Sequence, residues 1–277
     1  MTEKRGKSVG NRQQRSKVQE KLKRREQRYE RERKMLHKDI SSERAVLEEV
    51  FDRSTLMTIY HLMNKGTIDE IHGAVKAGKE SKLYWGKDKD NNTLAIKIFL
   101  TVSSEFKKGM LVYIQGDPRF TRVKRDTRSL IYLWAQKEFK NLHTALEAGV
   151  NVPKPIAVSR NVLVMRFIGE KGISAPLLRE APLKNPDRTY RQILANVKRL
   201  YKKAGLVHAD LSEYNIMIWK GKPVLFDVSQ AVSRKHPMAN EFLRRDLENM
   251  RRYFVRLGVA VPTIDELLKK VTGNVKS

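Results

Sequence analysis

The sequence contains no cysteine, so disulfide bonds, thiolate metal sites and cysteine nucleophiles are all excluded. No segment approaches the ~18 consecutive apolar residues that a membrane-spanning helix needs, and we expect no membrane partner. Residues 1–38 are polar and have no apolar stretch behind Lys4 and Arg5, which argues against a secretory signal. Five of the six histidines are scattered without the spacing of metal ligands, so a zinc site is not expected. These absences together predict a soluble cytoplasmic protein.

Acidic residues are scarce relative to basic ones. The 277 residues include 57 Lys or Arg and 31 Asp or Glu, which gives a formal net charge of +26 and a pI near 10.2. Such a surplus attracts polyanions, because neutralising a phosphate backbone releases its condensed counterions. Nucleic acid is therefore the leading candidate partner, and a merely solubilising surface charge is the alternative. With 40% apolar residues the chain can still bury a core, in one large or two small lobes.

The basic excess is concentrated at the N-terminus. Residues 1–38 contain 15 Lys or Arg against five Glu, a net charge of +10. Residues 1–17 have few large apolar side chains and are expected to be disordered, since burial would not offset the lost chain entropy. Residues 18–36 are rich in helix formers and could fold on a partner surface; for their outer half a solvated charged extension is the alternative. We assign residues 1–44 to a basic, partly disordered extension.

The rest of the sequence alternates between helical and strand patterns. In chain order, we expect a helix over residues 45–63 capped by Ser41 or Ser42, an antiparallel meander over 68–100, a helix over 129–148, a buried strand over 162–168, a helix over 187–204, a loop and hairpin over 206–232, and helices over 240–257 and 263–271. This order predicts an α+β protein with an N-terminal lobe of antiparallel sheet and helix, and a mainly helical C-terminal lobe. We place the lobes at residues 45–165 and 166–277. The joint near residues 166–169 is where a ligand cleft would form.

One stretch contains residues suited to phosphoryl transfer. The segment from His208 to Asn215 reads H-A-D-L-S-E-Y-N, with Asp210 in its third position. Two short apolar runs separated by Gly221 follow, as in a hairpin, and Asp227 comes after them. A hairpin returns the chain to its start, so the three oxygen-bearing side chains should converge and suit Mg²⁺ bound to phosphate oxygens. The H-x-D-x-x-x-x-N pattern with a later Asp matches the catalytic loop and metal-binding Asp of kinases, whereas an isolated H-x-D would be an ordinary surface loop.

A kinase also needs a cation near the nucleotide phosphates. Lys97 lies in the β-type run T-L-A-I-K-I-F, where alternation places it on the same face as Ala95 and Phe99. Burying a lysine there is costly without a partner, and Glu138 on the following helix is the natural one. The sequence therefore predicts a Lys97–Glu138 ion pair; a lysine at the sheet edge that extends into solvent is the alternative.

Residues 75–84 are the candidate for a loop that covers the nucleotide phosphates. Gly78 permits a tight turn there, and Ser81 with free backbone N–H groups could contact phosphate. The loop does not have the G-x-G-x-x-G pattern, so by itself it is a weak indication. For the adenine we expect the strand that leaves the first lobe, within residues 162–169, to contribute backbone groups rather than side chains.

These motifs together resemble those of the RIO-type atypical serine/threonine protein kinases, over roughly residues 45–260. The matching segments are G-K-E-S (78–81), A-I-K-I-F (95–99), G-D-P-R-F (116–120), Q-K-E-F-K-N-L (136–142), V-M-R-F-I-G (164–169), A-P-L-L (175–178), V-H-A-D-L-S-E-Y-N (207–215) and F-D-V-S-Q (226–230). The G-D-P-R-F segment and the absence of an N-terminal winged-helix pattern resemble the first RIO subfamily. The short C-terminal end resembles that of an archaeal member.

The resemblance implies a two-lobed protein-kinase-like fold, the RIO domain, and roles for the residues of the catalytic segment. By resemblance, Asp210 is the proton acceptor, and Asn215 and Asp227 bind the metal. In the family the latter Asp can itself be phosphorylated, which would make Asp227 a phospho-acceptor in an ATPase cycle.

The resemblance also implies roles in nucleotide binding. Lys97 would contact the ATP phosphates and Glu138 would hold it in place. Arg166 and Ile168 would contact the adenine through their backbones. Lys76 departs from the family pattern, because it stands where the first subfamily usually has a serine in the nucleotide loop.

The implied ligands are ATP and Mg²⁺, with Mn²⁺ as an alternative metal. The family acts in maturation of the small ribosomal subunit, so the implied partners are the precursor of that subunit and its RNA. No protein substrate is indicated, and a monomer is the expectation. The family lacks the activation loop of ordinary kinases, and residues 107–128 correspond in position to its flexible loop.

Four functions are left to compare. The first is an ATP-dependent serine/threonine protein kinase with ATPase activity, and the second is an assembly factor whose ATP hydrolysis gates binding and release from pre-ribosomes. A small-molecule kinase is a third, against which Ser212-Glu-Tyr and the basic tail argue. The fourth, an RNA-binding protein with a relic kinase fold, predicts no ATP affinity, yet none of the catalytic positions is missing.

Overall fold

The computed structural model describes residues 51–78, 80–100, 109–120, 123 and 126–273. The predicted basic extension, residues 1–44, lies outside them. The chain divides into two compact units, residues 1–61 and residues 62–277, and the second contains every site residue predicted above. Among the described residues, no helix is both long enough and apolar enough to cross a bilayer.

The first helix of the described chain is α3 (Arg53–Asn64). The sequence predicted one helix over residues 45–63, but Phe51 and Asp52 are not helical, so the uninterrupted helix was wrong. The reason is a local cap: a carboxylate oxygen of Asp52 accepts a hydrogen bond from the Thr55 N–H at 2.7 Å. An Asp in this position satisfies an N–H group that the first helical turn leaves without a partner.

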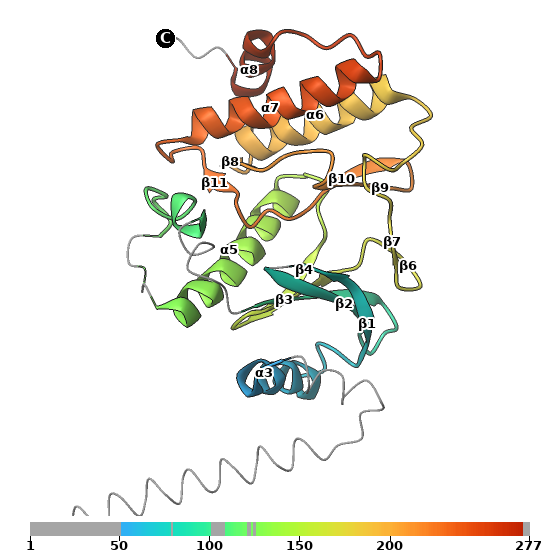
Figure 1. The fold of residues 1–277 in the computed structure, drawn as a ribbon, viewed down its shortest axis with the longest axis vertical. Coiled ribbons are helices and arrows are strands. Elements are labelled where there is room, and N and C mark those ends of the chain that lie inside the picture. Colours follow the sequence, from blue (N-terminus) through green and yellow to red (C-terminus); the bar gives the residue numbers. More distant parts are fainter. Residues whose placement is uncertain (1–50, 79, 101–108, 121–122, 124–125, 274–277) are drawn as a thin grey trace, which may run out of the picture. The chain divides into compact units, whose positions relative to one another are not determined.

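A five-stranded antiparallel sheet forms the N-terminal lobe (Figure 1). Its strands are β1 (Glu70–Ala77), β2 (Ser81–Lys87), β3 (Thr93–Phe99), β4 (Pro155–Ser159) and β5 (Val162–Arg166), in the spatial order β1-β2-β3-β5-β4. The first three strands form the predicted meander, and β5 then pairs with β3 from the other side. In this register Lys97 lies opposite Leu83 on one neighbour and Leu163 on the other. The sheet therefore places Lys97 on a central strand.

Helix α5 (Thr127–Glu147) contacts β4 and β5 of this sheet. It was predicted from residue 129, and it begins earlier because the Asp126 carboxylate caps it by accepting a hydrogen bond from the Ser129 N–H at 2.9 Å. Its buried face includes the apolar side chain of Trp134 and also two charged ones, Lys137 and Glu138. Charged residues are almost never fully buried unless they are paired, so we expect Lys137 and Glu138 to have polar partners outside α5.

The C-terminal lobe is mainly helical, as predicted, with three short two-stranded ribbons. Its helices are α6 (Pro186–Lys202), α7 (Ala239–Arg256) and α8 (Ile264–Thr272), and its ribbons are β6 (Gly169–Glu170) with β7 (Ile173–Ser174), β8 (Leu206–Val207) with β11 (Val232–Ser233), and β9 (Ile216–Trp219) with β10 (Lys222–Leu225). The predicted hairpin within residues 206–232 is β9–β10. The pairing of β8 with β11 was not predicted, because nothing local in the sequence joins two segments that far apart.

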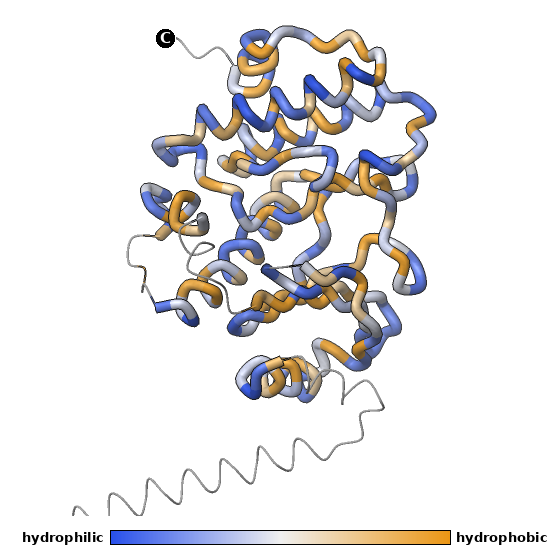
Figure 2. The backbone as a smooth tube through the Cα atoms, viewed as in Figure 1, coloured by the Kyte–Doolittle hydropathy of each residue, from blue (hydrophilic) through white to orange (hydrophobic). Residues whose placement is uncertain are grey.

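One hydrophobic cluster runs through both lobes. Ala95 and Leu163 of the sheet and Trp134 of α5 belong to the same cluster as Leu206 and Phe254 of the C-terminal lobe. In Figure 2 hydrophobic and hydrophilic positions alternate along α6 and α7, which is the pattern of helices with one buried face. The predicted α+β, two-lobed fold is confirmed, and its continuous core holds the two lobes as one unit.

Candidate active site

The β9–β10 hairpin brings together the polar residues on either side of it. Its turn consists of Lys220 and Gly221, both with positive φ (+49° and +73°), as two-residue hairpins with the right twist require. At the open end the Phe226 N–H donates to the Asn215 carbonyl at 3.1 Å. The Asn215 amide nitrogen donates to the carbonyl of Asp210 at 2.7 Å and to its carboxylate at 3.0 Å. The hairpin thus places Asn215 next to Asp210 and next to the segment that leads into the second Asp.

Side chains of α7 hold the backbone of the loop that carries Asp210. Asp246 is fully buried, and its two carboxylate oxygens accept hydrogen bonds from the N–H groups of Ala209 and Leu211, both at 2.8 Å. Ala209 has φ of +67°, a strained conformation for a residue with a side chain, and the Arg245 guanidinium donates to its carbonyl. Burial raises the pKa of Asp246 to about 7, against the opposing effect of the two N–H donors. These contacts fix the backbone on both sides of Asp210.

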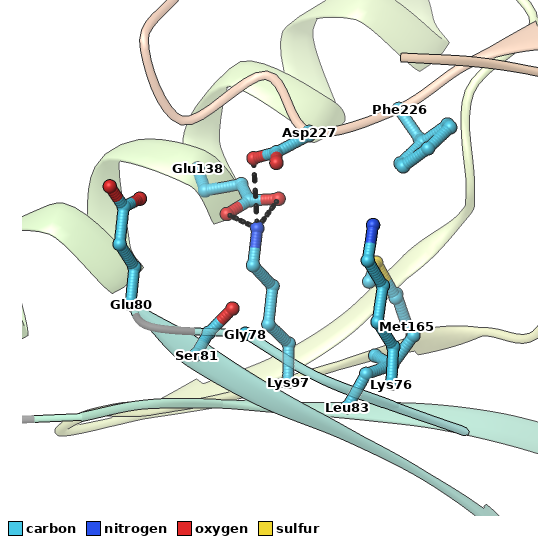
Figure 3. A pocket seen from close by; sticks show the side chains of 10 residues that line it. All are labelled: Lys76, Gly78, Glu80, Ser81, Leu83, Lys97, Glu138, Met165, Phe226 and Asp227. Carbon is cyan, nitrogen blue, oxygen red and sulfur yellow. Dashed lines mark hydrogen bonds and ion pairs between the residues drawn. The ribbon is translucent and has the colours of Figure 1, made fainter. Parts of the chain in front are cut away.

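Lys97 is the centre of an ionic cluster (Figure 3). Its ammonium lies 2.7 Å and 3.0 Å from the two carboxylate oxygens of Glu138 and 2.9 Å from a carboxylate oxygen of Asp227. Burial alone would lower the pKa of Lys97, but the two carboxylates outweigh burial and raise it. Burial raises the pKa of Glu138 to about 7; Lys97 opposes that shift and Asp227 adds to it. The predicted contact of Lys97 with Glu138 is thus present, and a second carboxylate shares the same cation.

The two aspartates differ in electrostatic environment. Burial would raise the pKa of Asp227, but Lys97 and a hydrogen bond from the Ser229 hydroxyl hold it below its usual range. Burial and the nearby Asp227 raise the pKa of Asp210, although the hydrogen bond from Asn215 opposes them. One carboxylate is therefore tuned to stay ionised and the other to take up a proton more readily.

His208 is buried and connects the two loops of the site. Its Nε2 lies 3.2 Å from the Phe226 carbonyl, and since a carbonyl can only accept, Nε2 carries the hydrogen. Burial lowers the pKa of His208 to about 4, against the opposing effect of Asp227. Among the described residues its Nδ1 has no hydrogen-bond partner. His208 is thus a neutral structural bridge rather than an acid or a base.

Two adjoining cavities lie between the sheet and the catalytic segments. The first, about 330 Å³, is polar and is lined by Lys97, Glu138 and Asp227. The second, about 250 Å³, is lined mainly by apolar side chains, among them Ala95 and Met217. Both share Lys76, Leu83, Met165 and Phe226 as lining residues, so they are continuous. A polar end joined to an apolar one suits a ligand with phosphates at one end and a flat base at the other.

The strand leaving the first lobe lines the apolar cavity with Arg166 and Ile168. The Arg166 guanidinium binds Asp88 in the β2–β3 turn at 2.7 Å, so its side chain is turned toward that turn. Its backbone N–H donates to the Lys154 carbonyl at 2.8 Å, and the Ile168 carbonyl accepts from the Ala175 N–H at 2.9 Å. These two bonds leave the Arg166 carbonyl and the Ile168 N–H as the candidate groups for contacting a base.

The loop between β1 and β2 covers the polar cavity. The Gly78 N–H donates to the Ser81 carbonyl at 2.9 Å, which closes the turn, and both residues line the cavity. Glu80 lines it as well, as Figure 3 shows, and was not singled out from the sequence. Burial raises the pKa of Glu80, and the proximity of Asp227 raises it further. Ser81 therefore lies where the sequence placed it, beside an unexpected carboxylate.

Comparison with known proteins is consistent with this arrangement. The RIO domain family matches residues 82–267. The RIO-type serine/threonine-protein kinase Rio1 of Haloferax volcanii is 42% identical over 229 residues, covering 83% of this chain and 78% of the relative. The same-named protein of Methanocaldococcus jannaschii is 39% identical, covering 88% and 81%. Serine/threonine-protein kinase rio1 of Schizosaccharomyces pombe is 39% identical over 88% of this chain, which spans about half (50%) of that longer relative.

The fold also matches a solved structure. The Rio2 kinase of Chaetomium thermophilum, in its ADP/Mg²⁺-phosphoaspartate complex, aligns with a TM-score of 0.60 and 25% identity, covering 79% of this chain and 67% of that one. With a family match over most of the chain and archaeal relatives about 40% identical, this chain belongs to the RIO family of atypical serine/threonine kinases, Rio1 type.

Proposed function

We propose that this protein is an ATP-dependent serine/threonine protein kinase that also hydrolyses ATP, with Mg²⁺ as its metal and Mn²⁺ as an alternative. The observation that carries the proposal is the contact of Lys97 with both Glu138 and Asp227, beside the hydrogen-bonded pair of Asp210 and Asn215. A buried cation, an ionised carboxylate and an Asp–Asn pair at one cavity are the parts that phosphoryl transfer requires.

Asn215 and Asp227 are the proposed metal ligands, and their chemistry fits Mg²⁺. The hydrogen bonds of Asp227 given above use its Oδ1, which leaves Oδ2 for a cation. The amide nitrogen of Asn215 is engaged by Asp210, which leaves its oxygen for the same cation. Mg²⁺ prefers such oxygen ligands, and bound there it would neutralise charge on the nucleotide phosphates.

The nucleotide would bind across both cavities. We assign the adenine to the apolar cavity, where the Arg166 carbonyl and the Ile168 N–H can read its edge. Ser81 and Lys97 would contact the phosphates, while Glu138 keeps the Lys97 ammonium in position. Support for this orientation comes from the polarity of the two cavities, since among their described lining residues a buried cation occurs only in the first.

Asp210 is the proposed base. Its raised pKa favours proton uptake, and the hydrogen bond from Asn215 orients its carboxylate. With a serine or threonine hydroxyl in place, Asp210 takes the hydroxyl proton as the oxygen attacks the terminal phosphorus and ADP leaves. In the ATPase cycle the Asp227 carboxylate attacks the terminal phosphorus instead and ADP leaves; water, giving its proton to Asp210, then releases phosphate from the aspartyl phosphate. The phosphoaspartate named for the Chaetomium thermophilum Rio2 complex supports this second route.

The biological role that we propose is maturation of the small ribosomal subunit, in the cytoplasm and as a monomer. The precursor subunit and its RNA are the proposed partners, in line with a net charge of +26. The alternative is an assembly factor in which ATP hydrolysis gates binding to the pre-ribosome and little protein is phosphorylated. In this alternative Asp227 accepts the phosphoryl group. Its direct contact with Lys97, the proposed phosphate-binding residue, supports this possibility.

Substitution of the two aspartates tests the chemistry. We expect Asp210→Ala and Asp227→Ala each to lower ATP turnover with Mg²⁺ at least about 100-fold, because a general base contributes about 10²–10⁴-fold and metal ligation at least as much. Asp265→Ala, at an exposed acid on α8, is the matched control and should keep wild-type turnover. Phosphate release and transfer to a generic protein substrate are measured side by side. Wild-type turnover in both variants would overturn the proposed function.

A further inference from the structure

The segment that follows Asp227 is held by side chains from outside it. Lys137 of α5 is fully buried, and its ammonium donates to the carbonyls of Ser229 and Ala231, both at 2.6 Å. Asn141, one turn further along the same helix face, donates to the carbonyls of Val228 at 2.8 Å and Ala231 at 3.1 Å. Two polar side chains of one helix thus bind three carbonyls within four residues of Asp227.

A second pair of residues completes the set from another part of the chain. The Arg119 guanidinium donates to the Asn141 side-chain oxygen at 2.7 Å and to the Ala231 carbonyl at 3.2 Å. It also forms two hydrogen bonds with Asp117, at 2.7 Å and 2.9 Å. Asp117 in turn accepts a hydrogen bond from the Ser233 N–H at 3.1 Å. We call Asp117, Arg119, Lys137 and Asn141 the loop clamp.

The loop clamp is more than core packing. Burying a lysine whose nearest acceptors are backbone carbonyls costs more than burying an apolar residue of the same size. Asp117 and Asn141 are also buried, at 2% and 1% exposure, and every hydrogen bond given above for the clamp leads to the segment after Asp227 or to another clamp residue. Four polar groups directed at one backbone segment specify the conformation of that segment.

That conformation bears directly on Asp227. Asp227 has φ of +57°, which is unfavourable for a residue with a side chain and persists only where the surroundings enforce it. Lys137 is the neighbour of Glu138 on α5, so one helical turn holds both the loop after Asp227 and, through Glu138, the cation that Asp227 binds. The position of α5 therefore bears on both sets of contacts.

We propose that the loop clamp is the positioning device that sets the Asp227 carboxylate toward the bound metal, and that its four members are positioning residues of the reaction. This rests on the proposed function, in which Asp227 is a metal ligand. In protein kinases the Lys–Glu pair and the metal-binding Asp must both be in place, and helix position and activation-loop phosphorylation control this. Here hydrogen bonds built into the fold link the two, so the site is assembled without a phosphorylated loop.

Hydrogen–deuterium exchange tests the clamp without reference to activity. In full-length Lys137→Met and Asn141→Leu we expect backbone exchange across residues 227–233 to accelerate at least about tenfold, because lost hydrogen bonds release the segment. The β9–β10 hairpin should exchange as in the wild type. Arg119→Met is a third variant, at a side chain that is 31% exposed and therefore better tolerated, in case Lys137→Met does not fold. Unchanged exchange in Asn141→Leu and Arg119→Met would overturn the proposal.

The Mg²⁺ dependence of ATP turnover provides the second readout. Loss of residues that orient a metal ligand typically costs about 10–100-fold in metal affinity or activity, so the Mg²⁺ concentration for half-maximal rate should rise and kcat should fall, while KM for ATP changes less than about twofold. Thr58→Val is the matched control: Thr58 is also buried, at 3% exposure, and its hydroxyl donates to the Ser54 carbonyl at 2.8 Å within α3. An equal shift of Mg²⁺ dependence in Thr58→Val would refute the clamp. A wild-type protein without ATP turnover would refute the proposed function alone, and the exchange result would then decide on the clamp.

Discussion

Lys97 is the residue at which the two halves of the site meet, and its two carboxylate partners are not equivalent. The Glu138 side chain is 1% exposed and is enclosed by the protein, whereas that of Asp227 is 42% exposed toward the cavity. In the proposed function, Asp227 would exchange Lys97 for the metal, and the phosphates would take the released position on the ammonium. Glu138 keeps Lys97 in place throughout. The contact between Lys97 and Asp227 therefore holds the site ready for its ligands.

The buried, neutral His208 should make the stability of the fold depend on pH. Burial lowers its pKa from 6.5 to about 4 in the folded state, so the unfolded chain takes up a proton first as the pH falls. The stability that neutral His208 contributes is full above pH 6.5 and is lost as the pH falls toward 4. This loss amounts to at most about 3 kcal/mol. We expect His208→Gln, which can still donate to the Phe226 carbonyl, to lose less stability over this interval.

The measurement is the free energy of unfolding of both proteins in urea between pH 4 and 7. His143→Gln, at an exposed histidine of α5, is the control for losing an imidazole and should follow the wild type. If His208→Gln and the wild type lose stability in parallel, the buried neutral histidine is not a source of acid sensitivity.

Some residues of the site could be found from spacing and others could not. Asp210, Asn215 and Asp227 were predicted because a short motif and a hairpin, both local in sequence, determine where they lie. Asp246 was missed because its partners, the N–H groups beside Asp210, are 35 and 37 residues away. The sequence did contain a signal: Asp246 falls at a buried position among the apolar residues of α7, where an acidic side chain is expected to have a specific polar partner.

At the scale of secondary structure, the β6–β7 ribbon borders the proposed adenine site, because Ser174 at its end and Ala175 just after it line the apolar cavity. Gly169 begins this ribbon with φ of +154°, and a Cβ there would lie 2.1 Å from the Ile173 carbonyl oxygen, on the partner strand. Gly169→Ala must therefore open the ribbon. Since a displacement of about 1 Å can cost up to 10²-fold, we expect KM for ATP to rise at least about tenfold while the Mg²⁺ dependence stays the same.

Gly258→Ala separates this effect from backbone strain. Gly258 also has positive φ (+78°), but a Cβ there meets nothing within 4 Å, so the variant has the conformational cost without the collision. ATP turnover as a function of ATP concentration, with thermal unfolding in parallel, distinguishes the two. A KM that rises equally in both variants would show that general destabilisation, and not the ribbon, controls nucleotide affinity.

Elements defined by local patterns were predicted well, and those defined by distant contacts were not. The meander of β1 to β3, the β9–β10 hairpin and the long helices follow from alternation, turn residues and helical periodicity. The helix predicted over residues 45–63 was wrong at Asp52, because a capping carboxylate outweighed continuing apolar periodicity. The roles of Asp117 and Arg119 could not be predicted, because both act on a loop more than 100 residues away.

At the scale of the whole molecule, positive charge is distributed between the tail and the folded lobes. Residues 1–38 have a net charge of +10 out of +26, so most of the surplus belongs to the rest of the chain. Helix α6 alone has five Lys or Arg against one Asp. The proposed RNA binding therefore has two candidate sources of phosphate contacts, and the salt dependence of affinity can apportion them.

We predict that the tail and the folded lobes both contact RNA phosphates. Removing the tail should therefore make the affinity for RNA less dependent on salt concentration. The logarithm of the binding constant falls with the logarithm of salt concentration by about 0.7 to 0.9 for each phosphate neutralised. A variant lacking residues 1–38 should bind a small-subunit RNA fragment more weakly at low salt, with a slope smaller by several units, yet retain a measurable slope. Fluorescence polarisation between 50 and 300 mM KCl measures this, and an RNA of the same length with scrambled sequence separates specific from non-specific binding. An unchanged slope would place all phosphate contacts on the folded lobes, with α6 as the first surface to neutralise, and would leave the tail without a role in RNA affinity.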